Sequence, residues 1–347
     1  MFKKERIALL EKTLSEYVED GVFPGCNFAI VSDDDVYKTS VGYKQLVPEK
    51  IPNNLQTIYD LASLSKVTTT VTCLLKLMEE GKLSLNDKVS SYLDIAEKDL
   101  TINHCITHTT GFHRDIPNYR QMSKEEFIAT IMNAKCEVPF GTRVAYSDIN
   151  FLYLGFIVDK LTGSLDKYAH QVLFDPLGMK DTGYNPSKDK YERCASYEDE
   201  PARGGIIKGS VHDGKCYKLG GVTGHAGVFS TIEDLTHYVK MLLNNGTYEG
   251  KEILTPQSMA LYTKLRTPGL NERRSIGWVL ADSNYALGDY YSPETIYHTG
   301  FTGTSIQVDF QNRLAIIILC NRVHPSRNNL KILELRNHLH DLAYLCK

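Results

Sequence analysis

The sequence has no run of about eighteen apolar residues, so no segment is a candidate for a membrane-spanning helix. It also has no excess of charge of one sign, because 39 Lys and Arg stand against 42 Asp and Glu. Since the basic residues are also scattered, we do not expect nucleic acid as a partner. Internal repeats, low-complexity tracts and flexible linkers are absent as well. What remains is a chain of 347 residues, long enough for one large domain or two small ones.

Closely spaced cysteines are absent too. The eight cysteines form no Cys-x-x-Cys pair and none of the spacings typical of a zinc site. Cys73 and Cys320 lie within apolar runs, where a cysteine usually acts as a small buried hydrophobe. Because a secreted chain with so many thiols would risk stray disulfides, we expect a reducing, cytoplasmic location. The charged N-terminal stretch has no apolar core of a signal peptide, which agrees with this expectation unless a leader has been removed.

Hydrophobic periodicity predicts strands near both ends of the chain and helices between them. Apolar steps of three and four residues predict an N-terminal helix that ends at Gly21, and the runs 25–30 and 36–41 around an acidic turn predict a hairpin. Further helices are predicted over 62–80, 124–133, 147–161, 165–173, 231–244 and 330–345, and further strands over 276–281, 305–310 and 314–320. Residues 180–220 have weak periodicity and are expected to form long loops. This order favours a sheet assembled from both ends of the chain, with a helical insertion between.

Ser63 and Lys66 form the sharpest local signal, a Ser-x-x-Lys motif at the start of a predicted helix. Residues three apart on a helix project from one face, about 5–6 Å apart at their β-carbons. A serine hydroxyl is a weak nucleophile until a neighbouring group removes its proton, and a desolvated lysine amine can do so or relay the proton. Since this helix is apolar on most sides, Lys66 is expected to point inward, where a lysine is costly. The alternative for this motif alone is a helix start with a surface lysine.

Two further motifs follow in the chain. Residues 140–148 read Phe-Gly-Thr-Arg-Val-Ala-Tyr-Ser-Asp, and residues 297–304 read Tyr-His-Thr-Gly-Phe-Thr-Gly-Thr between predicted strands. Together with Ser-x-x-Lys, this order resembles the superfamily of class C β-lactamases, D-alanyl-D-alanine peptidases (penicillin-binding proteins) and β-lactamase-like esterases. Its members carry Ser-x-x-Lys, then Tyr-x-Asn, then Lys-Thr-Gly or His-Thr-Gly on a strand beside the active site. The resemblance covers nearly the whole chain, since it includes the segments 23–26, 100–112, 220–231 and 321–325.

The resemblance implies a role for each matching residue. Ser63 would be the acylated nucleophile, Lys66 its proton partner, and Tyr146 the base for Ser63 and then the acid for the leaving group. A free phenol is a poor base near neutral pH until a cation such as Lys66 stabilises the phenolate. The backbone N–H groups of Ser63 and Phe301 would form the oxyanion hole. The residues that we expect to contact the substrate are Asp148, His298, Thr299, Gly300 and, from a glycine-rich loop, His225.

Two positions depart from the family pattern. Asp148 stands where many relatives have asparagine, and an ionised carboxylate cannot donate a hydrogen bond to an acyl-amide carbonyl. This weakens the case for efficient β-lactam hydrolysis, although Asp148 can instead pair with Lys66. His298 stands where many relatives have lysine, and a histidine of ordinary pKa, about 6.5, is only partly charged near neutral pH. We therefore expect weak, pH-dependent binding of substrate carboxylates at His298.

The remaining histidines carry weaker signals. His104, His108 and His113 follow one another at steps of four and five residues, which is weak evidence for a metal, so we predict no metal site. The reaction that the resemblance implies needs no organic cofactor either. Asp213 beside His212 is a loop pair for which the sequence offers no third member.

The resemblance implies a mixed α/β (α+β) fold of the β-lactamase and DD-peptidase type, with an antiparallel sheet flanked by helices plus a helical lobe. We expect one catalytic domain over 1–347, with the sheet from about 1–60 and 265–347 and the lobe from about 67–264. The implied reaction is acyl transfer to water from a small-molecule ester, amide or peptide, by a carboxylesterase or a D-alanyl-type peptidase or amidase with weak or no β-lactamase activity. The alternative is a catalytically idle penicillin-recognition sensor or scaffold, against which intact Ser63, Lys66 and Tyr146 argue.

Overall fold

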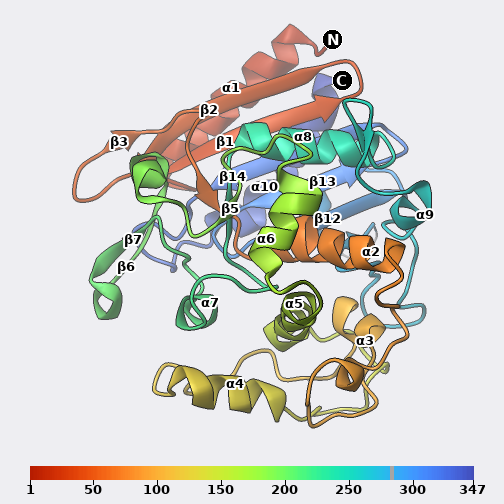
Figure 1. Ribbon diagram of the computed structural model, residues 1–347. Helices are drawn as coiled ribbons and strands as arrows, with labels where there is room; N and C mark the ends of the chain where they lie inside the picture. Colours follow the sequence, from red (N-terminus) through yellow and green to blue (C-terminus); the bar gives the residue numbers. More distant parts are fainter. Residues whose placement is uncertain (282–284) are drawn as a thin grey trace.

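The centre of the molecule is a sheet of seven antiparallel strands, seen in a computed structural model that describes residues 1–281 and 285–347 (Figure 1). Its strand order is β11-β12-β13-β14-β1-β2-β3. The bounds are Gly25–Ser32 (β1), Val36–Gln45 (β2), Ile51–Pro52 (β3), Val279–Leu280 (β11), Thr295–Thr299 (β12), Ser305–Asp309 (β13) and Leu314–Cys320 (β14). The two ends of the chain meet where β1 pairs with β14, in a register that sets Phe28 opposite Ile318. A sheet assembled from both ends of the chain, as predicted, is confirmed.

Helices cover both faces of this sheet. Side chains along β1 and β14 alternate between the two faces, so each strand contributes apolar residues to both. One face packs against α1 (Lys4–Glu19) and α10 (Lys331–Cys346) through a cluster that includes Phe28, Ile30, Ile316 and Ile318. The other face packs against α8 (Ile232–Leu243) in the main core, which includes Ala29, Val31, Ile317 and Leu319. The predicted terminal helices are therefore confirmed. The expected lobe boundary is wrong at α8, since the buried face of this helix lies on the sheet.

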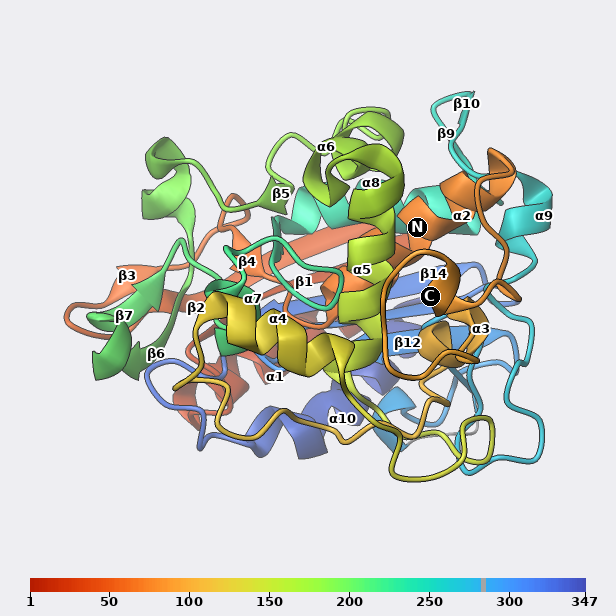
Figure 2. The ribbon, with the colours of Figure 1, turned by 60° about the horizontal axis from the view of Figure 1, so that its bottom comes forward.

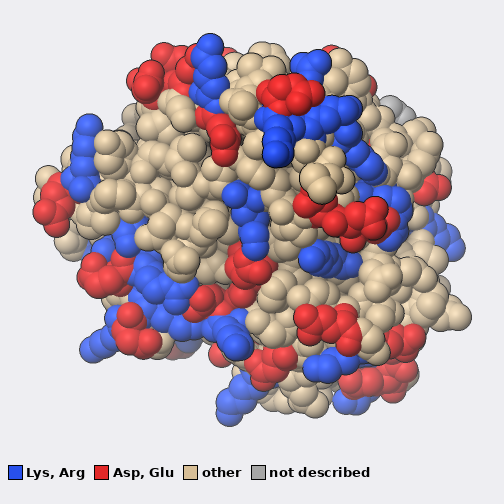
Figure 3. Space-filling model, turned by 90° about the horizontal axis from the view of Figure 1, so that it is seen from above, with Lys and Arg blue, Asp and Glu red and all other residues tan. Residues whose placement is uncertain are grey.

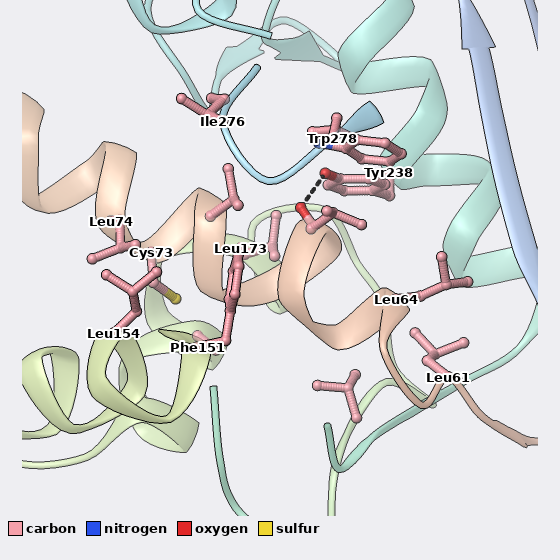
Figure 4. Close-up of a cluster of buried hydrophobic side chains, with 14 of the residues drawn as sticks. Leu61, Leu64, Cys73, Leu74, Phe151, Leu154, Leu173, Tyr238, Ile276 and Trp278 are labelled. Atoms are coloured by element: carbon pink, nitrogen blue, oxygen red, sulfur yellow. Dashed lines mark hydrogen bonds between the residues drawn. The ribbon is translucent and has the colours of Figure 1, made fainter. Parts of the chain in front are cut away.

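The middle of the chain forms the helices of the lobe. Figure 2 shows two of them, α4 and α5, in front of the sheet. The bounds of the lobe helices are η1 Lys66–Thr70, α2 Val71–Glu79, α3 Ile102–Ile106, α4 Lys124–Met132, α5 Asp148–Thr162, α6 Leu165–Ala169 and η3 His170–Phe174, of which η1 and η3 are π-helical. The predicted helices are confirmed, apart from the π-helical turns. Figure 4 shows Leu74 of α2 beside Leu154 of α5, and Trp278 beside Tyr238 of α8, whose hydroxyl donates to the Val67 carbonyl (3.0 Å). The lobe and the sheet thus share one core.

Residues 180–220 contain more regular structure than their weak periodicity predicts. A small sheet has the order β4-β8-β5, and a hairpin pairs β6 with β7. The bounds are Tyr59–Asp60 (β4), Gly183–Tyr184 (β5), Ser196–Glu200 (β6), Gly205–Lys208 (β7), Gly214–Lys218 (α7) and Val228–Ser230 (β8). These elements are short, and β6 is largely polar, so no apolar alternation marks them in the sequence. The expectation of loops was wrong for these stretches.

The remaining elements are short connections at the surface. They are η2 Val89–Ser91, η4 Lys188–Arg193, η5 Pro201–Arg203, β9 Thr247–Tyr248, β10 Lys251–Glu252, α9 Pro256–Met259 and η6 Tyr285–Leu287. On the face that Figure 3 shows, basic and acidic side chains are mixed. All eight cysteines, each in the described part of the chain, are free thiols. Within residues 1–281 and 285–347, no helix combines the length and the apolar character needed to cross a membrane.

Candidate active site

Ser63 is half-buried and stands where strand β4 turns into the helical segment. The residue before it, Ala62, has a left-handed backbone with φ of 49°, a conformation that a residue with a Cβ adopts only under constraint. The buried Asp60 carboxylate supplies the constraint, because its Oδ1 accepts from the Ala62 N–H (2.8 Å) and its Oδ2 from the His212 N–H (2.7 Å). Burial raises the pKa of Asp60 to about 6 in spite of these donors. Asp60 thus fixes the sharp turn that presents Ser63.

Two ionisable side chains contact the Ser63 hydroxyl. Lys66 Nζ donates a hydrogen bond to Ser63 Oγ (3.1 Å), and the Tyr146 hydroxyl donates another (2.8 Å). Lys66 lies one helical turn after Ser63, as the motif spacing predicts. Tyr146 arrives from the segment that precedes α5, 83 residues along the chain. The three residues that the motifs single out therefore meet at one oxygen atom.

Lys66 is fully buried, as its apolar helix predicts, so a surface lysine is excluded. Its Nζ also donates to Asp148 Oδ1 (2.9 Å) and to the His225 carbonyl (2.9 Å), and it lies 5.0 Å from the centre of the Tyr146 ring. Burial alone would lower the pKa of Lys66, but the Asp148 carboxylate and Tyr146 outweigh burial and raise that pKa above its ordinary value. The pairing of Asp148 with Lys66, weighed from the sequence, is therefore confirmed.

Asp148 also begins a chain of charged groups that leads to His225. Its Oδ2 lies 3.3 Å from Lys215 Nζ, which lies 3.2 Å from Asp115 Oδ1 and 3.6 Å from Asp213 Oδ2. Asp213 Oδ1 in turn lies 2.9 Å from His225 Nε2. The expectation that Asp213 has no further partner was therefore wrong. Motif reasoning missed Lys215, because it lies in the weakly periodic stretch and approaches Asp148 only in the folded chain.

His225 is buried. Its ring is 1% exposed, and its Nδ1 lies 2.8 Å from Thr223 Oγ1. The loop that carries it is pressed against α5, since a Cβ on Gly155 would lie 2.5 Å from the Gly224 nitrogen. The side chain of His225 is thus held by Asp213 and Thr223, and its contact with a substrate stays a prediction. The backbone carbonyl of His225, which holds Lys66, is its contribution to the site.

The Tyr146 ring lies against two basic side chains that the motifs do not predict. The His108 ring stacks on it with centroids 4.5 Å apart, and the Arg274 guanidinium lies 5.9 Å from its centre. Arg274 is buried and donates from Nη1 to the Gly277 carbonyl (3.1 Å). Burial, and then Arg274, hold the pKa of His108 well below its ordinary value, so this imidazole is uncharged near neutral pH. Of these two basic side chains, the Arg274 guanidinium is therefore the cationic one beside the phenol.

His298 is buried on β12, with its ring centroid 6.3 Å from that of Tyr146 and its Nδ1 2.9 Å from the Thr299 carbonyl oxygen. Burial first, and then Arg274 and Lys66, hold the pKa of His298 well below 6.5. The expectation of an ordinary, partly charged histidine was therefore wrong, because the site removes water from the ring and already holds two cations. His298 is uncharged throughout the neutral range.

The turn after β12 lies beside Ser63. The Thr302 and Thr304 hydroxyls donate to the carbonyls of Asp60 (3.0 Å) and Leu61 (3.2 Å). A Cβ on Gly300 would lie 2.6 Å from the Leu61 carbonyl oxygen, so only glycine permits this approach, and half-buried Thr299 precedes it. Within the described residues, the backbone N–H groups of Ser63 and Phe301 donate to no intramolecular acceptor. Two free N–H groups on adjoining segments suit an oxyanion hole.

The histidines considered for a metal have other partners. His104 caps a helix at Thr101, His108 stacks on Tyr146, and His113 bonds the Asp115 carbonyl. A different group, Asp148, Asp213 and His225, has ligand atoms within 4.8 Å of one another. Both of its carboxylates already contact lysine ammonium groups, so the protein's own cations lie where a metal ion would have to bind.

A serine with lysine and tyrosine at its hydroxyl, beside two free N–H groups, has the kinds of group that nucleophilic catalysis by a serine requires. A family model described as Beta-lactamase matches residues 10–339. The chain therefore belongs to the beta-lactamase family and is a serine hydrolase. A protein of Salmonella schwarzengrund (strain CVM19633), named as a D-alanyl-D-alanine carboxypeptidase, is 31% identical over 375 aligned positions, which cover 95% of this chain and 86% of the relative.

Solved structures give the same fold. EstCE1, described as a hydrolase with promiscuous acyltransferase activity, has a TM-score of 0.76 at 21% identity and covers 97% of this chain and 99% of its own. Simvastatin synthase (LovD) of Aspergillus terreus has a TM-score of 0.77 at 18% identity and covers 97% of this chain and 98% of its own. The predicted fold class is thereby confirmed, and the family model and the Salmonella relative confirm the predicted family.

Proposed function

We propose that the protein hydrolyses carboxylic esters or amides through an acyl-enzyme on Ser63. The observation that carries the proposal is the pair of hydrogen bonds at Ser63 Oγ, one from Lys66 and one from Tyr146. A serine hydroxyl in this position can give its proton to Tyr146 once the phenol is ionised, and the Lys66 ammonium stabilises that phenolate. The negative charge that develops on the acyl oxygen is then met by the N–H groups of Ser63 and Phe301.

The steps balance with these residues alone. In the reactive form Tyr146 has lost its proton to solvent, and Lys66 and Arg274 stabilise the phenolate charge. Ser63 Oγ then bonds to the acyl carbon while its proton passes to this phenolate, which becomes a neutral phenol. Tyr146 returns the proton to the leaving alcohol or amine as its bond to the acyl carbon breaks. A water molecule then attacks the ester, giving up its proton along the same route, and Ser63 is regenerated with release of the acid.

Two features favour esters over β-lactams. The Asp148 carboxylate has no hydrogen to donate to an acyl-amide carbonyl. Its Oδ1 accepts from Lys66, and its Oδ2 lies 3.3 Å from Lys215 Nζ. His298 is uncharged and gives no electrostatic attraction to the carboxylate that penicillins carry. The Salmonella relative's name keeps D-alanyl peptides among the substrates to test.

The deciding experiment assays the purified protein in parallel against short p-nitrophenyl esters, D-alanyl-D-alanine peptides and nitrocefin. We expect turnover of the esters above that of nitrocefin, and loss of that turnover in Ser63→Ala. An idle recognition module would bind a fluorescent penicillin without turning over any of the three substrate classes. Hydrolysis that persists in Ser63→Ala would refute the proposal.

A further inference from the structure

The aspartate at position 148 poses an electrostatic problem for the proposed site. Many relatives carry a neutral asparagine there, whereas Asp148 brings a full negative charge to 2.9 Å from Lys66 Nζ. An isolated carboxylate at that distance binds the ammonium strongly, and it cancels the positive charge that Tyr146 needs from Lys66. A working site with aspartate therefore needs a second cation on the same carboxylate.

Lys215 is that second cation. It lies on α7, its side chain is 12% exposed, and its Nζ is 3.3 Å from the Asp148 oxygen that Lys66 does not bind. Asp115 and Asp213 hold the ammonium from the other side, at 3.2 and 3.6 Å, and the Tyr119 ring lies 5.6 Å away. These carboxylates raise the pKa of Lys215 despite its burial, so its charge is permanent.

We propose that Lys215 is a positioning residue that neutralises the outer oxygen of Asp148, so that the Asp148–Lys215 pair replaces the neutral amide of other family members. This inference rests on the proposed function. Lys215 touches none of the reacting groups, and it acts on Lys66 only through Asp148. The Asp148–Lys215 ion pair explains how the site can hold an aspartate at position 148 while Ser63, Lys66 and Tyr146 keep their roles.

Other titratable groups also lie around Lys66, but Asp148 is the charged group that contacts its ammonium directly. His108, His298 and Cys216 of α7 interact electrostatically with Lys66. Burial keeps the pKa of both imidazoles well below, and that of the thiol well above, their ordinary values. Tyr146 is the reacting partner, Arg274 lies beyond its ring, and His225 presents its carbonyl.

The test is the pH profile of kcat/KM for a neutral p-nitrophenyl ester in Lys215→Met. Loss of the positive charge raises the proton affinity of the coupled Lys66–Tyr146 pair, so the rising limb moves to higher pH, whichever of the two is the base. Without Lys215 the whole charge of Asp148 acts on Lys66 at 2.9 Å, and at an effective dielectric constant of about 20 roughly a quarter of that pair interaction is worth about one pH unit. We therefore expect an upward shift of about one unit and about a tenfold lower rate at a pH below the limb.

Two single variants control for folding. Lys218→Met changes a lysine on the same helix whose Nζ donates to the Met122 carbonyl, and its limb should stay at the wild-type position. Lys215→Arg keeps the charge and should restore most of the wild-type profile. A lower kcat in Lys215→Met with an unmoved limb would reveal a merely structural role and overturn the inference.

A double-mutant cycle with Asp148→Asn tests the route. Because Lys215 acts through Asp148, Lys215→Met should move the limb less than half as far in the Asp148→Asn background. An equal shift in both backgrounds would overturn the inference. Each variant is also labelled with a fluorophosphonate: if labelling stays confined to Ser63 but the limb does not move, the inference fails while the proposed function stands.

Discussion

Replacement of Asp148 by asparagine removes one carboxylate from between two lysines without changing its shape. Lys66, which is fully buried, keeps only Ser63 Oγ and the His225 carbonyl as charge-independent acceptors. Removing one partner of a buried ion pair costs about 3–5 kcal/mol. We expect the lower end, about 3 kcal/mol, because the Asp148 side chain is 17% exposed and asparagine still accepts one hydrogen bond.

This loss of stability can be measured as a fall in the melting temperature, Tm. With an unfolding entropy of about 2.1 cal/mol/K per residue, a chain of 347 residues has about 0.7 kcal/mol/K at the midpoint. A loss of about 3 kcal/mol then lowers Tm by about 4 °C by differential scanning calorimetry. Asp99→Asn, which breaks an exposed pair with Lys88, is the matched control and should leave Tm unchanged.

The effect of Asp148→Asn on Tm should also depend on pH, and the direction of that dependence follows from the pKa of Asp148. Burial alone would raise the pKa of Asp148, but Lys66, His225 and Lys215 outweigh it and lower that pKa in the folded protein. A lowered folded pKa stabilises the protein above the unfolded value of about 3.9, and the stabilisation is lost as the pH falls through the folded pKa. The difference in Tm between wild type and Asp148→Asn should therefore be full at neutral pH and narrow in acid. A Tm within about 1 °C of wild type at neutral pH would refute the reasoning.

Asp148→Asn should also raise acylation by a β-lactam relative to ester cleavage, because it restores an amide donor; an unchanged or lower ratio of the two rates would count against this. Tyr146→Phe should lower kcat by a factor of about 10²–10⁴, since it deletes the proton acceptor. Tm should stay unchanged, because the ring remains stacked on His108. Activity within about tenfold of wild type would remove Tyr146 from the mechanism. The kcat/KM profiles of an anionic and a neutral ester should run parallel from about pH 6 to about pH 8.5, because His298 stays uncharged; a selective loss of the anionic substrate with rising pH would show that His298 titrates.

Local sequence patterns were sufficient for the parts of the site that lie on single elements. Ser63 and Lys66 share one helical turn, and the apolar surroundings of that helix predict the buried lysine that the structure has. The strands β1 and β14 were also predictable, because each is a nearly continuous apolar run between turn residues.

Groups that meet only through tertiary contacts left no such pattern. Lys215 reaches Asp148 from 67 positions further along the chain, out of a region without periodicity. Arg274 approaches Tyr146 from a segment without a motif. The charge state of His298 depends on burial and on Arg274 and Lys66, and none of these is a property of its neighbours in sequence. Sequence singles out the proposed reacting groups here, and the fold sets their electrostatics.

The central claim is that Ser63 carries the acyl group, and intact-protein and peptide mass spectrometry test it most directly. Wild type is treated with a fluorophosphonate and, separately, quenched in acid during turnover of a slow p-nitrophenyl ester. We predict one adduct per chain on the peptide that contains Ser63, and in Ser63→Ala no adduct and a loss of turnover by several orders of magnitude. An adduct on another residue, or activity in Ser63→Ala at about a tenth of wild type or more, would contradict the account.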